Sequence, residues 1–244
     1  MALFDALLDL ADDHLVLGHR LSEWCGHAPM LEEDLAMPNM ALDLIGTARS
    51  LYEYAALTEG KGRNEDDLAY LRGEREYRNC LLVERPNRDF AQTMLRQLYF
   101  TAFMQPYWSA AEASSDKTIQ GIAGKAVKEM AYHIRHSGEW VVRLGDGTEE
   151  SAQRMADAIE DLHLYTNELF EPGNAAGVAA LPDRAALRPA WQATIDSVFA
   201  QAMLASPEIP FPQTGGRKGL HGEDLGHMLA NMQSVHRAHP GATW

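Results

Sequence analysis

The chain has 244 residues, 46% of them hydrophobic, which is enough to bury the core of one large domain. Its formal net charge of −14 argues against nucleic acid and against an anionic membrane surface as partners, because both would repel it. Cys25 and Cys80 form no CxxC pair, residues 1–13 carry acids where a signal peptide carries basic residues, and no run approaches the about 18 apolar residues of a membrane span. These features predict a cytoplasmic protein without a disulfide framework.

Apolar residues at helical spacing predict two long helices at the start of the chain. The first covers about residues 4–24, and the second covers about residues 30–57 and ends at Gly60. The pattern of the charged stretch, residues 64–82, predicts shorter helical pieces. The stripe of the second helix that faces the core is expected to contain Leu35, Leu42, Ile45, Ala48 and Tyr52.

The rest of the chain continues the helical pattern. Further helices are predicted over about residues 89–108, 116–144, 149–170, 183–202 and 222–236. Asp89 and Asp183 are candidate N-caps, and the short link 114–117 makes the helices on either side of it antiparallel neighbours. Prolines and glycines in residues 206–219 predict an irregular arm.

These elements predict an all-α fold, because sustained strand alternation and internal repeats are both missing from the sequence. The expected architecture is a bundle of four long helices with additional helices and a C-terminal arm. We expect a single domain, with the core bundle in residues 1–172 and an extra helix and the arm in residues 173–244.

A bundle of this kind is the scaffold of ferritin-like di-iron oxygenases, in which two helices each give a Glu and two others each give a Glu-x-x-His. The sequence supplies few of these ligands. Glu23 suits a helix boundary as well as an inward position, and the helix over residues 89–108 has no acid after its N-cap. In the next helix the spacing is Glu129-x-x-x-His133, one residue too long, and Met130 stands where the Glu would be. His133 is therefore predicted to be a core histidine.

One correctly spaced pair, Glu160-x-x-His163, stands alone and is typical of a solvated helix face. The alternative function is an autonomous di-iron or other metal-dependent oxidase. Its candidate ligands are Glu129, His133, His136, Glu160 and His163.

Arg49 lies on the predicted apolar stripe, between Ile45 and Tyr52. A buried arginine needs a carboxylate partner, because an unpaired buried charge is costly. We therefore predict that Glu23 or another inward acid pairs with Arg49 and fills the volume of a metal site.

The C-terminal run from Thr214 to Leu220 resembles an anion nest, in which glycines expose backbone N–H groups beside two cations. The favoured interpretation is a structural turn with a basic spot that faces a partner. The candidate contact residues are Gly215, Gly216, Arg217, Lys218, Gly219 and His221.

Four segments together resemble one protein family over essentially the whole chain. They are LSEWCGHAP at residues 21–29, the stretch 39–49, the helix segment 128–133 and the run GGRKGLH at residues 215–221, with Pro240-Gly241 after it. The family is PaaC, the structural C subunit of phenylacetyl-CoA epoxidase, an enzyme also called phenylacetate-CoA oxygenase. The resemblance implies a ferritin-like, structural, non-catalytic subunit with a degenerate di-iron site. Its degenerate positions would be Glu23, Gly46, Arg49, Met130 and His133.

The resemblance also implies partners. The A subunit, the catalytic di-iron oxygenase component, would carry the metal centre and bind phenylacetyl-CoA. A small B subunit and a reductase with NADPH, FAD and an iron–sulfur cluster would complete the oxygenase complex. The reaction is O2-dependent epoxidation of the aromatic ring in bacterial phenylacetate catabolism, a form of aromatic compound degradation. No cofactor is expected on this chain itself, and homodimerisation stays open.

Overall fold

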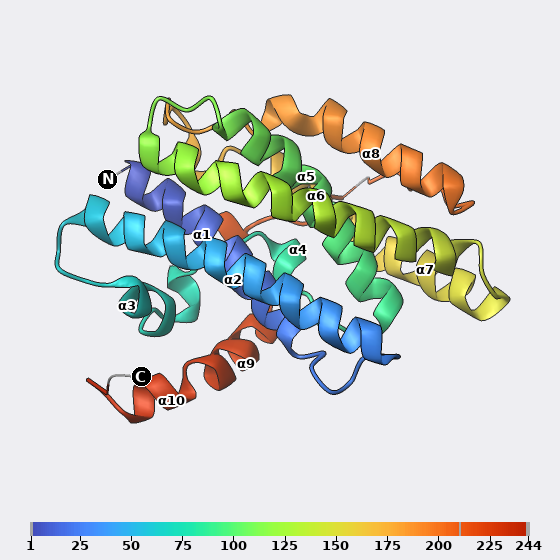
Figure 1. The fold of residues 1–244 in the computed structure, drawn as a ribbon, viewed down its shortest axis with the longest axis horizontal. Helices are drawn as coiled ribbons and strands as arrows, with labels where there is room; N and C mark the ends of the chain where they lie inside the picture. Colours follow the sequence, from blue (N-terminus) through green and yellow to red (C-terminus); the bar gives the residue numbers. More distant parts are fainter. Residues whose placement is uncertain (1, 210, 243–244) are drawn as a thin grey trace.

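A computed structural model describes residues 2–209 and 211–242, and it shows two antiparallel helical hairpins packed into one bundle (Figure 1). The first hairpin is α1 (Ala2–Ser22) with α2 (Leu31–Glu59), and the second is α5 (Phe90–Ala111) with α6 (Lys117–Gly145). The described residues contain no strand, so the predicted all-α fold with four long helices is confirmed. None of the described helices has the length and apolar character needed to cross a membrane.

Shorter elements cover the two ends and sides of this bundle. The remaining α-helices are α3 (Glu65–Tyr70), α4 (Leu81–Glu84), α7 (Glu149–Leu162), α8 (Arg188–Gln201), α9 (Glu223–Met232) and α10 (Ser234–Ala238). The 3₁₀ turns are η1 (Glu74–Glu76), η2 (His163–Phe170), η3 (Gly173–Ala175), η4 (Ala185–Leu187) and η5 (Gly216–Lys218). Helices α7 and α8 pack on α5 and α6, whereas α9 and α10 lie on the other side, beyond α2 and α3 (Figure 1).

Helices α1 and α5 form the centre of the bundle. Every residue of α1 from Ala6 to Gly18 is buried, and so is every residue of α5 from Ala91 to Met104. A helix that is buried on all sides must be apolar all round or must satisfy its polar groups internally. Asp9, Asp12, Asp13 and His14 lie within this buried part of α1, so each of them needs a partner inside the protein.

The predicted buried stripe of α2 is wrong at two positions. Leu35 is 60% exposed and Leu42 is 66% exposed, whereas Met40 and Leu44 are buried. The reason is that α2 has apolar residues on two faces, and helical spacing alone does not show which face meets α1. Gly18 of α1 allows the two helices to approach closely, since a Cβ there would lie 2.8 Å from a side-chain carbon of Ile45.

Candidate functional site at the bundle centre

His133 of α6 is the most central of the predicted site residues. Its side chain is fully buried, with Nδ1 3.1 Å from the Gln97 amide nitrogen of α5 and Nε2 3.2 Å from a carboxylate oxygen of Asp43 on α2. With the Gln97 amide as donor, Nδ1 accepts, and Nε2 carries the proton that is donated to Asp43. Both ring nitrogens are therefore engaged, and His133 has no free lone pair for a metal ion.

Two further pairs lie along the same seam between α2 and α6. His136 Nε2 lies 2.8 Å from the Glu33 carboxylate, and Lys125 Nζ lies 3.1 Å from the Glu129 carboxylate. The Thr47 hydroxyl of α2 also reaches Glu129, at 3.5 Å. The acids of this seam are thus matched by imidazole, ammonium and hydroxyl groups of the protein, an arrangement that ties the two hairpins together.

The predicted degenerate di-iron positions do not converge. Met130 and His133 are buried in the bundle, and Gly46 faces Lys125, whose Nζ would lie 3.4 Å from a Cβ at that position. Glu23 lies just beyond the end of α1, where its half-exposed carboxylate pairs with Arg20 at 3.0 Å. Their assignment to a lost metal site stays a prediction.

The prediction that Arg49 is buried and pairs with Glu23 or another inward acid is wrong. The Arg49 side chain is 67% exposed and pairs with Glu53 at 3.0 Å and with Glu65 at 3.3 Å. Arg49 lies on the same outer face of α2 as Leu35 and Leu42. The wrong choice of buried face for α2 therefore also placed Arg49 in the core.

Glu160 and His163 lie elsewhere, at the outer side of the second hairpin. His163 Nδ1 is 2.9 Å from the Tyr99 hydroxyl, and burial lowers the pKa of this histidine. Together with Phe211 the pair lines a hollow of about 670 Å³ between α7 and residues 207–209, 211 and 213. Across residues 2–209 and 211–242, no group of three or more His, Cys, Asp and Glu side chains is placed to hold a metal ion. The described residues therefore do not form the ligand set of a di-iron centre.

The C-terminal turn forms an anion nest, and the anion is a side chain of the same protein. The Glu168 carboxylate accepts from the backbone N–H groups of Gly215 at 2.9 Å, Arg217 at 3.2 Å and Leu81 at 2.7 Å. A Cβ at Gly216 would lie 2.1 Å from the Asn79 carbonyl oxygen, so the close approach requires glycine there.

The Arg217 side chain points inward, to α1. Its guanidinium donates to both carboxylate oxygens of Asp13, at 2.9 and 2.7 Å, and also to the Arg78 carbonyl. The side chain of His221 is buried as well. Burial is the largest single influence and would lower its pKa, but the hydrogen bond to Glu84 at 2.7 Å, the charge of Glu84 and the hydrogen bond to the Tyr77 carbonyl together outweigh burial and raise the pKa.

The expectation that this arm faces a partner is therefore wrong for most of its residues. Gly215, Gly216, Arg217, Gly219 and His221 are covered by the chain itself. Lys218 is exposed and keeps an outward position. These contacts are those of a structural turn, as the sequence interpretation of residues 214–220 also predicted.

The whole chain, residues 1–244, matches the model of the family described as phenylacetic acid catabolic protein. The chain belongs to this family. It is also 45% identical over 243 residues to the C subunit of 1,2-phenylacetyl-CoA epoxidase from Escherichia coli (strain K12), an alignment that covers 97% of each protein. The resemblance inferred from the four sequence segments is confirmed by both matches.

Sequence reasoning missed the acids of α1 in this family member. Asp12 forms a buried ion pair with Arg72, whose Nη1 lies 3.0 Å from the carboxylate, and it also accepts from the Tyr52 hydroxyl. The Asp9 carboxylate accepts from the backbone and side-chain nitrogens of Asn174, both at 2.8 Å. The available signal was a group of three acids, Asp9, Asp12 and Asp13, among the mostly apolar residues of α1, because buried carboxylates require cationic or N–H partners.

Proposed function

We propose that this chain is a non-catalytic structural subunit of the multicomponent ring-1,2-phenylacetyl-CoA epoxidase, which binds and stabilises the di-iron catalytic subunit in aerobic phenylacetate catabolism. The observation that carries the proposal is the state of His133, whose two ring nitrogens are both held by protein groups. A metal ligand must offer a lone pair, and the neighbouring acids Glu33 and Glu129 are also taken up by side chains of this chain.

The oxidative chemistry then belongs to other chains of the assembly. The catalytic subunit would supply the di-iron centre and the phenylacetyl-CoA site, and a reductase with FAD and an iron–sulfur cluster would deliver electrons from NADPH. The relative from Escherichia coli is named as a subunit, which supports a role within an assembly. This chain would contribute a rigid helical bundle that holds its partner in a stable form.

Iron analysis of the purified chain tests the proposal. We expect far less than one iron atom per chain, even after incubation with excess Fe²⁺ under anaerobic conditions, because the bundle centre lacks free ligands among the described residues. Co-expression with the catalytic subunit should raise the melting temperature and the iron content of that subunit.

The matched control is the catalytic subunit by itself, measured in the same assay. About two irons per chain bound by this protein in the absence of a partner would contradict the proposal and would support the autonomous metal-dependent oxidase instead.

A further inference from the structure

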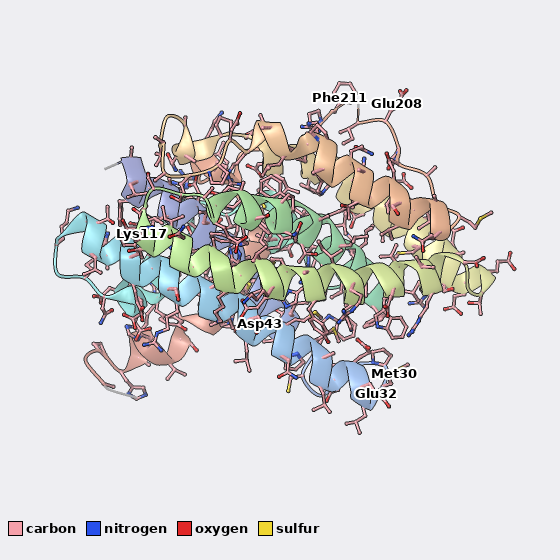
Figure 2. All side chains as sticks on the ribbon, turned by 45° about the horizontal axis from the view of Figure 1, so that its top comes forward. Met30, Glu32, Asp43, Lys117, Glu208 and Phe211 are labelled. Carbon is pink, nitrogen blue, oxygen red and sulfur yellow. The ribbon has the colours of Figure 1, made fainter. Side chains whose placement is uncertain are left out.

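Helix α2 carries a row of exposed leucines on the side that faces away from α1. The row, which we name the α2 ridge, consists of Leu31, Leu35 and Leu42, with Met30 just before the helix. Steps of four and seven residues place the three leucines on one helix face. Figure 2 shows Met30 and Glu32 at the end of α2 that projects away from the other long helices. Several large apolar side chains in a row on one outer face are typical of an interaction surface.

The edge of the ridge is acidic. Glu32 is exposed beside Leu31. Asp43, next to Leu42, is partly exposed where α2 meets α6 (Figure 2), and one of its carboxylate oxygens is held by His133 Nε2 at 3.2 Å. Arg49 continues the same face, but its guanidinium is held by Glu53 and Glu65. A chain that covers the ridge would therefore gain by placing a cationic side chain opposite Glu32.

A second copy of this chain fits this edge poorly. A two-fold contact brings the same patch of both copies together, so the acids beside each ridge would enter the interface twice. Each copy also carries a formal net charge of −14. A different protein that carries lysine or arginine beside an apolar helix avoids both costs.

We propose that the α2 ridge docks an α-helix of the catalytic subunit, which presents an apolar face bordered by lysine or arginine. This inference rests on the proposed function and names the surface through which it acts.

The test is a titration of the purified catalytic subunit with variants of this chain, by calorimetry and size-exclusion chromatography. Leu35→Glu and Leu42→Glu should each raise the Kd about tenfold or more, because a charge would enter the centre of the contact. Both leucines are exposed, so the melting temperature of each isolated variant should stay at the wild-type value. Glu32→Lys should weaken binding too, with the larger loss at low salt.

Leu57→Glu is the matched control, since Leu57 is 79% exposed near the other end of the same helix. The ridge inference is overturned, and the proposed function stands, when the ridge variants bind as tightly as Leu57→Glu and wild type. It is also overturned when wild type is a dimer in solution that Leu35→Glu makes monomeric, because a second copy then occupies the ridge. Wild type that does not bind the catalytic subunit at all overturns the proposed function and the inference together.

Discussion

Replacing Arg217 by alanine is expected to lower the free energy of unfolding by about 3–5 kcal/mol. The substitution leaves the Asp13 carboxylate buried without its cation and removes the donor to the Arg78 carbonyl. Arg184 approaches the same carboxylate only to 3.9 Å and does not replace the two hydrogen bonds. Urea unfolding followed by far-UV circular dichroism measures the change.

Two further variants separate the buried pair from general effects of substitution. Lys218→Ala alters the exposed neighbour and should change stability by less than about 0.5 kcal/mol. The double variant Asp13→Asn, Arg217→Met removes both charges and should recover part of the loss, because the isolated buried charge is gone. A loss for Arg217→Ala as small as that for Lys218→Ala would show that the pair contributes little.

The contact matters for the whole fold because it links the two ends of the chain. Asp13 lies on the first helix, and Arg217 lies in the turn before α9. The same turn binds Glu168 from η2 through backbone N–H groups. The C-terminal arm therefore acts as an internal brace for the bundle, and a change at Arg217 should loosen the packing of α1.

Local signals explain what the sequence could predict. The bounds of the long helices followed from apolar spacing, and Asp89 caps α5 as expected by accepting from the Gln92 N–H at 2.9 Å. The prediction that His133 is a core histidine was also correct, because Met130 and His133 follow the spacing of the buried face of α6. Such features depend on residues within one or two turns of each other.

The errors arose where two distant segments decide the outcome. The sequence predicts a buried Arg49 and a partner-facing Arg217, yet Arg49 is exposed and Arg217 is buried. The difference is set by Asp13, which is 204 residues away from Arg217 in the sequence. Spacing within a helix carries no information on such pairs, and it does not distinguish the inner face of α2 from an outer face that is also apolar.

Acidification from pH 6.5 to pH 4 is expected to destabilise the protein through His14. Burial of this side chain within α1, beside Phe100 and Trp108, lowers its pKa from 6.5 to about 4, although the hydrogen bond to the Leu10 carbonyl opposes the shift. The neutral ring is therefore stable in the folded state where the unfolded chain already binds a proton. The contribution is fully present above pH 6.5 and is lost as the pH falls through about 4, a change on the order of 3 kcal/mol.

His14→Gln tests this directly, with stability measured by urea unfolding between pH 7 and pH 4. The variant should lose packing energy at pH 7, but its stability should fall less steeply with acid, so that the two curves approach each other.

Asp9 acts in the opposite sense, since burial raises its pKa to about 6 and its contribution is lost as the pH rises from 3.8 through 6. Asp9 is present in both proteins, so the difference between the curves isolates His14. A curve for His14→Gln that runs parallel to that of wild type would contradict the burial argument.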